Sequence, residues 1–498
     1  MKRVVILHGT SGVDLSRCAK KLLDALRPGV RAELADVEVP IKSSQNAERM
    51  TDVVWGTTRD AMTSFVWPEA ARGCLQRLLS SEADIGILVC HLVYYRGRTH
   101  EFYEPGDLAQ IYKEEWAKTR NIKDTSPPPL LVLTLIDDIY DIFHRLTVKD
   151  EVFDLLRFIN DEYRRKEQKG ELPIAPDPQY VIAFEQMAAT MLRILDWRSR
   201  EVSAGDALAR RSGGRSYLVA IKHPVQSVCN LIRSECGLSN LEFCLAYLSH
   251  PITRPRKLQK KSQDGEWLDF VRQFHVFVLA SGQSQANGFR TILFMPTAID
   301  ELRIAEPESP SDPPIFPTLH RRWPLFSEVG EELLYELPFG YVSYDEFERG
   351  VLLEGIFNPV GSRRDVDAFG RVTLSKYATN AAEVPGRLSK EAKYQVNGLL
   401  ATIRQQVLAQ IAFRDHTLVR QCGRFLLYRP LFGEGVISGG VGAELKNWGD
   451  ITQHSLKLSS QGSPVPWPWG PAVFIHDKVD LDALTPQVRN LTNNVATR

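Results

Sequence analysis

Two acidic residues in the C-terminal half have the surroundings expected of catalytic carboxylates. Glu444 lies near the end of the small-residue stretch "SGGVGAEL", in which Ser438 and Gly440 stand where a helix would begin. Asp415 follows Arg414 in "IAFRDHTLVRQ", ahead of an apolar, strand-like run. A carboxylate beside the anomeric carbon of a sugar can stabilise the positive charge that develops there or form a covalent glycosyl intermediate. Both residues are therefore candidates for the cleavage of a glycosidic bond.

A third stretch, "AYLSHPIT", is a predicted strand that ends in a polar turn carrying Tyr247, Ser249 and His250. In open α/β sheets, ligands bind beyond the carboxyl ends of the strands, so we expect these residues to line one pocket with Glu444 and Asp415. Each residue also has a structural interpretation. Glu444 could be a solvated carboxylate in the first turns of a helix, and Asp415 could be a cap or an exposed partner of Arg414 on a helix face. Tyr247 could be a core aromatic and His250 a structural histidine.

The order of these three elements resembles the nucleoside 2-deoxyribosyltransferase superfamily and its N-glycosidase relatives. The resemblance implies that Glu444 is the nucleophile and that Ser438 and Gly440 are the small residues that precede it. It also implies that Tyr247 and Ser249 form the pocket at the end of the first strand. Water as the acceptor would give a hydrolase, and a second base would give a transferase.

The same resemblance implies that Arg414 and Asp415 form a turn before a strand, with Asp415 assisting departure of the base or binding a sugar hydroxyl. The chain departs from the family at one position, because Ser438 stands where the transferases often have an acidic residue. Asp415 or Glu434 would then take over that role, or the base is handled differently.

The N-terminal stretch "HGTSGVDLSR" resembles the phosphate-binding loop of nucleotide kinases. Gly9 and Gly12 match two of its glycines and Ser16 matches its magnesium-binding hydroxyl, whereas Asp14 and Leu15 replace the third glycine and the phosphate-pairing lysine. This departure predicts a domain that does not transfer phosphate efficiently. Alternatives are a tight structural turn before a helix, nucleotide binding without transfer, or a kinase with unusual phosphate contacts.

A further stretch, "HLVYYRGRTHEFY", follows another predicted strand of the N-terminal half. Its Tyr94 and Tyr95 could stack on a base, and Arg96 and Arg98 could pair with phosphates.

Strand-like and helix-like segments alternate along the chain, which predicts two parallel-sheet α/β domains. We expect a P-loop-kinase-like domain over residues 1–237 and a deoxyribosyltransferase-like, flavodoxin/Rossmann-like domain over 238–498, with insertions near 306–326 and 340–390. The proline-rich first insertion is expected to lack regular structure. The expected strands lie within 3–9, 31–39, 84–95, 127–136, 216–224, 241–253, 290–302, 424–430 and 471–477.

Composition narrows the functional classes. The 498 residues contain 61 Lys plus Arg and 61 Asp plus Glu, so no overall basic field favours nucleic acid or an anionic membrane. The seven cysteines form no C-x-x-C pair and no apolar run is long enough to span a membrane, so we expect no metal site, no cofactor and a cytoplasmic location. We also expect a homo-oligomer with no membrane partner, and a regulatory protein or nucleic acid as a further partner.

Together these features predict an N-glycosidase that acts on a nucleoside, nucleotide or dinucleotide. By analogy with the superfamily, it could serve as an effector of antiphage defence, with nucleoside salvage as the housekeeping alternative. A non-catalytic nucleotide-binding sensor and a nucleoside or nucleotide kinase are the alternatives from other functional classes.

Overall fold

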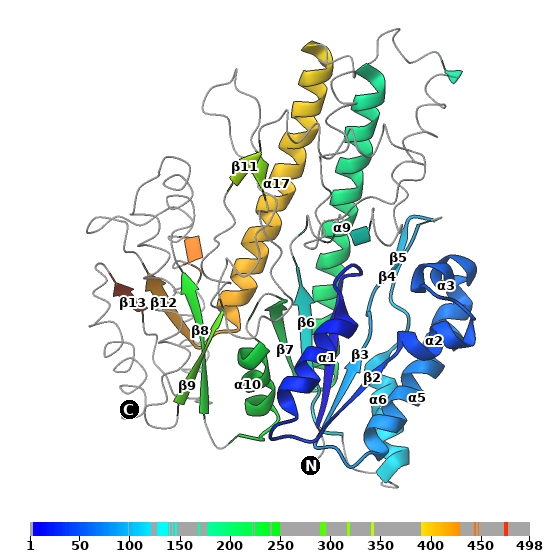
Figure 1. Cartoon of the computed structure of the whole chain (residues 1–498), viewed down its shortest axis with the longest axis vertical. Coiled ribbons are helices and arrows are strands. Elements are labelled where there is room, and N and C mark those ends of the chain that lie inside the picture. The colour runs from blue at the N-terminus through cyan, green and yellow to red at the C-terminus, as the bar shows by residue number, and fades with distance from the viewer. Residues whose placement is uncertain are drawn as a thin grey trace, which may run out of the picture.

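The protein is described from a computed structural model as an α/β protein with two parallel sheets (Figure 1). The residues that the structure describes are 3–97, 99–120, 127–137, 139, 142, 145–146, 168–169, 177–221, 223, 225–239, 242–249, 289–294, 316–318, 340–342, 390–428, 443–444, 447 and 473–476.

The first sheet has five parallel strands in the order β2-β3-β1-β6-β7. Its central strands are almost wholly apolar because helices cover both faces of the sheet, and each residue of β3 and β6 is buried. The strands are β1 (Arg3–Gly9), β2 (Ala32–Asp36), β3 (Ile85–Val89), β6 (Leu131–Ile136) and β7 (Arg215–Ala220).

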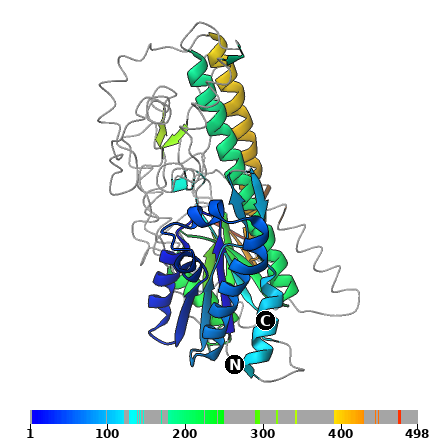
Figure 2. The same cartoon turned by 90° about the vertical axis from the view of Figure 1, so that its right-hand side faces the viewer.

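Helices pack on this sheet in two groups. In one, α1 (Leu15–Leu26) lies against α10 (Val225–Glu235), and in the other α5 (Trp67–Ser80) lies against α6 (Leu108–Arg120), which also touches α9 (Asp177–Arg211). Figure 2 shows helices on both sides of the sheet. Right-handed crossovers place the groups on opposite faces, because the chain reverses its direction across the sheet after β2. The carboxyl ends of β1 and β3 therefore meet at a topological switch point.

Smaller elements surround the carboxyl edge of this sheet. Asp36 ends β2 by accepting a hydrogen bond from the backbone N–H of Glu38 at 2.9 Å, where the next helix begins. The strand predicted over 31–39 is therefore shorter than expected. The smaller elements are α2 (Glu38–Ser44), α3 (Met50–Gly56), α4 (Arg59–Ala61), the π-helix η1 (Met62–Val66) and the antiparallel pair β4 (Tyr94–Arg96) and β5 (Glu101–Tyr103).

The second sheet has four parallel strands in the order β13-β12-β8-β9. All four were predicted as strands. In a short antiparallel pair, β10 and β11, the strand β10 falls within 306–326, which was expected to lack regular structure, so that expectation is wrong at this point. The elements are β8 (Glu242–Ser249), β9 (Phe289–Phe294), β10 (Phe316–Thr318), β11 (Gly340–Val342), α17 (Lys390–Arg420), β12 (Arg424–Tyr428) and β13 (Val473–His476).

The long helices α9 and α17 lie side by side and connect the two sheets (Figures 1 and 2). Gln410 of α17 donates a hydrogen bond to Ser199 of α9 at 2.7 Å. The side-chain amide of Gln421, just after α17, pairs with both the N–H and the carbonyl of Leu218 at 2.9 Å, and so occupies hydrogen-bonding groups on the edge strand β7. The division of the chain near residue 237 stays a prediction.

No helix in the described part of the chain is long and apolar enough to cross a membrane.

Candidate functional site

Three of the predicted site residues come together at the carboxyl end of β8. The Tyr247 hydroxyl donates a hydrogen bond to Oε1 of Glu444 at 2.8 Å, and the Ser249 hydroxyl donates one to Oε2 at 2.5 Å. Side chains two apart on a strand point to the same face, which explains how both reach one carboxylate. Tyr247 and Ser249 are fully buried. Each oxygen of Glu444 thus has its own donor, and the orientation of the carboxylate is fixed.

Asp415 is also close enough to act on this carboxylate. It forms a buried ion pair with Arg414, with Nη2 of Arg414 2.8 Å from Oδ1 of Asp415. Both residues lie within helix α17, so the prediction that they form a turn is wrong. A carboxylate paired with a guanidinium is favoured in its charged form, which suits hydroxyl binding better than proton donation to a leaving base.

The electrostatic environment of Glu444 favours its protonated form. Burial, followed by the negative charge of Asp415, raises the pKa of Glu444 to about 7, although the hydrogen bonds from Ser249 and Tyr247 and the charge of Arg414 act in the opposite direction. Burial and the same carboxylates raise the pKa of Tyr247 well above its usual range. Tyr247 therefore stays protonated, and its hydroxyl remains a hydrogen-bond donor to Glu444. Glu444 itself is present in both protonation states near neutral pH.

The remaining predicted residues of this site, His250, Ser438 and Gly440, lie outside the described residues. Their roles stay predictions.

The N-terminal glycines shape a tight connection between β1 and α1. A Cβ atom at Gly9 would collide with the backbone carbonyl oxygen of Leu135 on the neighbouring strand β6. Gly12 has φ +91°, a left-handed conformation that favours glycine. Ser16, at the start of α1, donates a hydrogen bond to Oδ2 of Asp36 at 2.6 Å. All three predicted positions, Gly9, Gly12 and Ser16, thus lie in or beside the connection.

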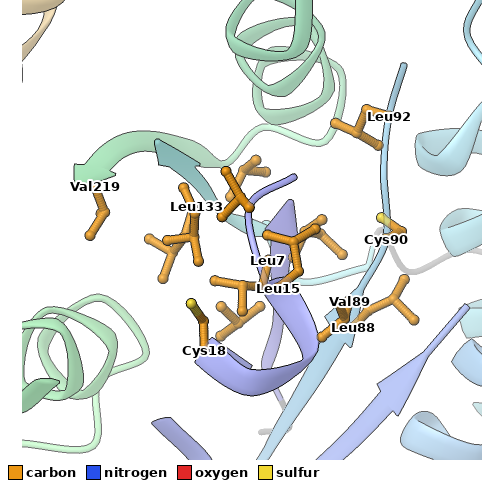
Figure 3. Packing of buried hydrophobic residues seen from close by; sticks show 14 of the residues in the cluster. Leu7, Leu15, Cys18, Leu88, Val89, Cys90, Leu92, Leu133 and Val219 are labelled. Atoms are coloured by element: carbon orange, nitrogen blue, oxygen red, sulfur yellow. The ribbon is translucent and has the colours of Figure 1, made fainter. Parts of the chain in front are cut away.

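The two departures from the kinase loop have structural roles. The Asp14 carboxylate accepts a hydrogen bond from the backbone N–H of Arg17 and caps α1, so it occupies a place where a phosphate oxygen would bind. Leu15 is 4% exposed and lies in the hydrophobic core, near Leu7 and Cys18 (Figure 3). A side chain in this position cannot pair with a phosphate. The structural alternative for this loop accounts for both residues.

A buried network of ionisable residues beside this loop was missed. Glu201 of α9 accepts a hydrogen bond from the backbone N–H of Val93 at 3.0 Å, and its Oε2 lies 2.9 Å from Nδ1 of His8. His91 Nδ1 donates to the carbonyl of Gly9 at 2.6 Å. Burial opposes the charged form of His91, but Glu201 and Glu38 outweigh it and raise the pKa of His91 to about 9.

The sequence feature that pointed to this network was the position of its two histidines relative to the strands. His8 and His91 each stand at the end of an apolar run, "VVILH" and "ILVCH", and these runs form the adjacent strands β1 and β3. Nothing in the pattern around Glu201 indicated that it would lie between them.

No protein-family model matches the chain, and no curated protein matches it. Among solved structures, the chain is similar to a thymidine kinase, in a crystal structure of EHV4-TK complexed with TP4A. The match has 11% sequence identity, covers 47% of this chain and 90% of that chain, and has a TM-score of 0.21. A TM-score this low supports no conclusion about function. The class of the protein follows from its own geometry. It is an α/β protein with a five-stranded parallel sheet, and a partly buried glutamate is held by two hydroxyl groups at the carboxyl end of β8 in a second sheet.

Proposed function

We propose that the protein is an N-glycosidase that cleaves the bond between base and sugar in a nucleoside, nucleotide or dinucleotide. The observation that carries the proposal is the pair of hydrogen bonds from Tyr247 and Ser249 to the two oxygens of Glu444. A nucleophile must approach the anomeric carbon along a defined direction, and a carboxylate whose orientation is fixed meets this requirement without further ordering.

In the proposed reaction, Glu444 attacks the anomeric carbon of the sugar. The bond from this carbon to the base nitrogen breaks, and its electron pair leaves with the base while a glycosyl ester forms on Glu444. Water then attacks the anomeric carbon, the ester bond breaks, and the Glu444 carboxylate is regenerated. One proton of that water ends on the released base, so the products are free base and free sugar. A second base in place of water would make the enzyme a transferase.

The surrounding residues have distinct roles in this scheme. Tyr247 and Ser249 orient the carboxylate, and their hydrogen bonds favour its ionised, nucleophilic form. Asp415 acts in the opposite direction by raising the pKa of Glu444, which makes the carboxylate a stronger base and a stronger nucleophile once ionised. With its charge fixed by Arg414, Asp415 is placed to accept a hydrogen bond from a sugar hydroxyl.

The test is chromatography of a panel of nucleosides, nucleotides and dinucleotides after incubation with the purified chain. We expect free base from at least one member, and a rate reduced by about 10³-fold or more in Glu444→Gln, which keeps the shape of the side chain but is not a nucleophile. Glu82→Gln is the matched control, because Glu82 is exposed and far along the chain from the site. Base release that persists in Glu444→Gln would show that another group performs the reaction.

The covalent step has its own readout. Intact-mass measurement of an acid-quenched reaction should show wild-type protein heavier by the mass of one sugar, and peptide mapping should locate this mass on Glu444. Base release without any sugar adduct would favour direct attack by water.

The biological setting that we propose is antiphage defence, in which a partner restrains a toxic nucleotide-cleaving activity. Expression of the wild-type chain alone should then arrest bacterial growth, whereas Glu444→Gln should be tolerated. Equal growth of both strains would favour the housekeeping alternative.

If no member of the panel releases base, a nucleotide-binding sensor is the remaining interpretation of this site. The structure gives less support to the kinase alternative, because Leu15 is buried where the catalytic lysine would be and Asp14 caps the helix.

A further inference from the structure

A cavity of about 310 Å³ opens beside the altered phosphate loop, away from Glu444. It lies at the carboxyl ends of β1, β2 and β3, the switch point at which α/β sheets bind ligands. Its lining combines three carboxylates with four aromatic side chains. The carboxylates belong to Asp14, Asp36 and Glu38, and the aromatic side chains to Trp55, Tyr94, Tyr95 and Trp197.

The cationic side chains of the lining are already engaged by carboxylates. Arg49 forms an ion pair with Asp52 at 3.1 Å, and Arg145 is paired with Asp137. The ring of His91 lies between Glu201 and Glu38, with Nε2 3.5 Å from Oε1 of Glu38. These cations are therefore largely neutralised within the protein.

The three lining carboxylates carry more negative charge than the positive charge of the lining that is not already paired with other carboxylates. Asp36 receives only neutral donors in the hydrogen bonds described above, from the Ser16 hydroxyl and the Glu38 backbone. Asp14 likewise accepts from a backbone N–H group. Burial raises the pKa of Glu38 even though the charges of His91 and Lys42 act in the opposite direction, so its negative charge is incompletely stabilised within the protein. The cavity therefore repels phosphate groups and attracts cations.

One polar group in the lining is unsatisfied among the described residues. Tyr94 is 4% exposed, and its buried hydroxyl has no hydrogen-bond partner there. Burial, followed by the negative charge of Glu38, raises the pKa of Tyr94, and both Tyr94 and Glu38 line the cavity. A buried polar group without a partner is costly unless a ligand or water satisfies it.

The aromatic side chains of the lining indicate which kind of cation the cavity would bind. Among the described residues, no three His, Cys, Asp or Glu side chains are arranged to hold a metal ion. Aromatic faces attract ammonium groups and also pack against apolar chains, which a hydrated metal ion would not exploit. Carboxylates bind ammonium groups through charge-assisted hydrogen bonds. The combination matches an organic cation with an apolar frame.

We propose that this cavity binds an aliphatic polyamine, with its ammonium groups on Asp36 and Glu38 and its methylene chain against Trp55 and the neighbouring aromatic rings. An unphosphorylated nucleoside would fill the same space but would bring no positive charge to Asp36 and Glu38. A nucleoside triphosphate would bring like charges together. The proposal does not depend on the chemistry proposed for Glu444.

The test is isothermal titration calorimetry of the full chain with spermidine, adenosine and ATP, in about 0.15 M salt to screen exposed surface charges. We expect saturable binding of one spermidine per chain and no binding of ATP. Binding should weaken at least tenfold in Glu38→Gln, which preserves size, and in Trp55→Ala. Asp24→Asn is the control, because Asp24 is an exposed carboxylate of α1 that pairs with Arg27 outside the cavity; it should leave the affinity unchanged within twofold.

Several results would overturn the proposal. Wild-type protein that binds adenosine or ATP but not spermidine would make the cavity a nucleotide site, and no heat with spermidine would also refute it. Equal weakening in Asp24→Asn would indicate non-specific attraction to surface carboxylates. Glu444→Gln should bind spermidine as wild type does, so failure of the glycosidase proposal and failure of this one give different results.

Discussion

The raised pKa of Glu444 predicts that the ionised form of this residue destabilises the folded protein. In the unfolded chain the carboxyl loses its proton near its ordinary value of 4.5, whereas in the folded chain it does so at about 7. Between these values the folded state binds more protons than the unfolded state, so stability falls as pH rises through this window and then levels off. Glu444→Gln removes the ionisation while keeping the size of the side chain.

The magnitude follows from the two pKa values. Each pKa unit corresponds to about 1.4 kcal/mol, so ionisation of Glu444 costs roughly 2.5 kcal/mol more at pH 8 than at pH 5. For a folding unit of about 200 residues, 1 kcal/mol shifts the thermal midpoint by about 2–4 °C. The midpoint of Glu444→Gln relative to wild type should therefore rise by about 5–10 °C between pH 5 and pH 8.

The assay is thermal unfolding of wild type and Glu444→Gln in matched buffers at pH 5, 6, 7 and 8. Comparison at each pH removes the contributions of the titrating groups that do not interact with Glu444. Glu82→Gln, at an exposed glutamate, should show no such growth with pH. A midpoint difference that is constant with pH, or that grows towards acid pH, would refute the claim that burial and Asp415 destabilise the ionised carboxylate.

Three further predictions concern the same residues and the altered loop. Tyr247→Phe removes a donor that favours ionised Glu444, so the acid limb of the activity–pH profile should move up by about 1 pH unit, as a pH–rate series would show. Leu15→Lys should lower stability by about 2–4 kcal/mol in calorimetry, because it buries a charge in the core, and radiolabelled ATP should reveal no gain of phosphate transfer. Gly9→Ala should destabilise the protein by about 2–4 kcal/mol, because its Cβ would collide with β6. Gly73→Ala should stabilise the protein by about 0.5–1 kcal/mol, because Gly73 lies in α5 with open space around it, and thermal unfolding distinguishes the two variants.

The strands of both sheets could be predicted because each strand is specified by consecutive residues of the chain. Strands that are buried on both faces read as continuous apolar runs, and β1, β3 and β6 are runs of this kind. The contact of Tyr247 and Ser249 with one carboxylate was also predictable, since their spacing of two places them on one face of β8. Both features depend on neighbours in the chain.

The features that sequence reasoning missed depend on partners far away in the chain. The contact between His8 and Glu201 spans 193 positions, and neither hydrophobic periodicity nor a motif indicates such a pairing. The turn expected at Arg414 and Asp415 was wrong for a different reason. The residues over 390–421 are typical of a long helix, whereas the family resemblance suggested a turn inside this stretch. The residues form the helix α17.

Asp14 and Leu15, the two residues that depart from the kinase loop, both act against phosphate binding. A phosphate-binding loop needs unsatisfied N–H groups at the start of a helix and a cation that reaches over them. Here Asp14 satisfies a backbone N–H of α1, and Leu15 turns into the core. Restoring a lysine at position 15 alone would leave the Asp14 carboxylate at the helix start. The loop that resembles the anion-binding loop of kinases lines an acidic cavity in this protein, and this difference in charge is why we expect the ligand of the cavity to be a cation.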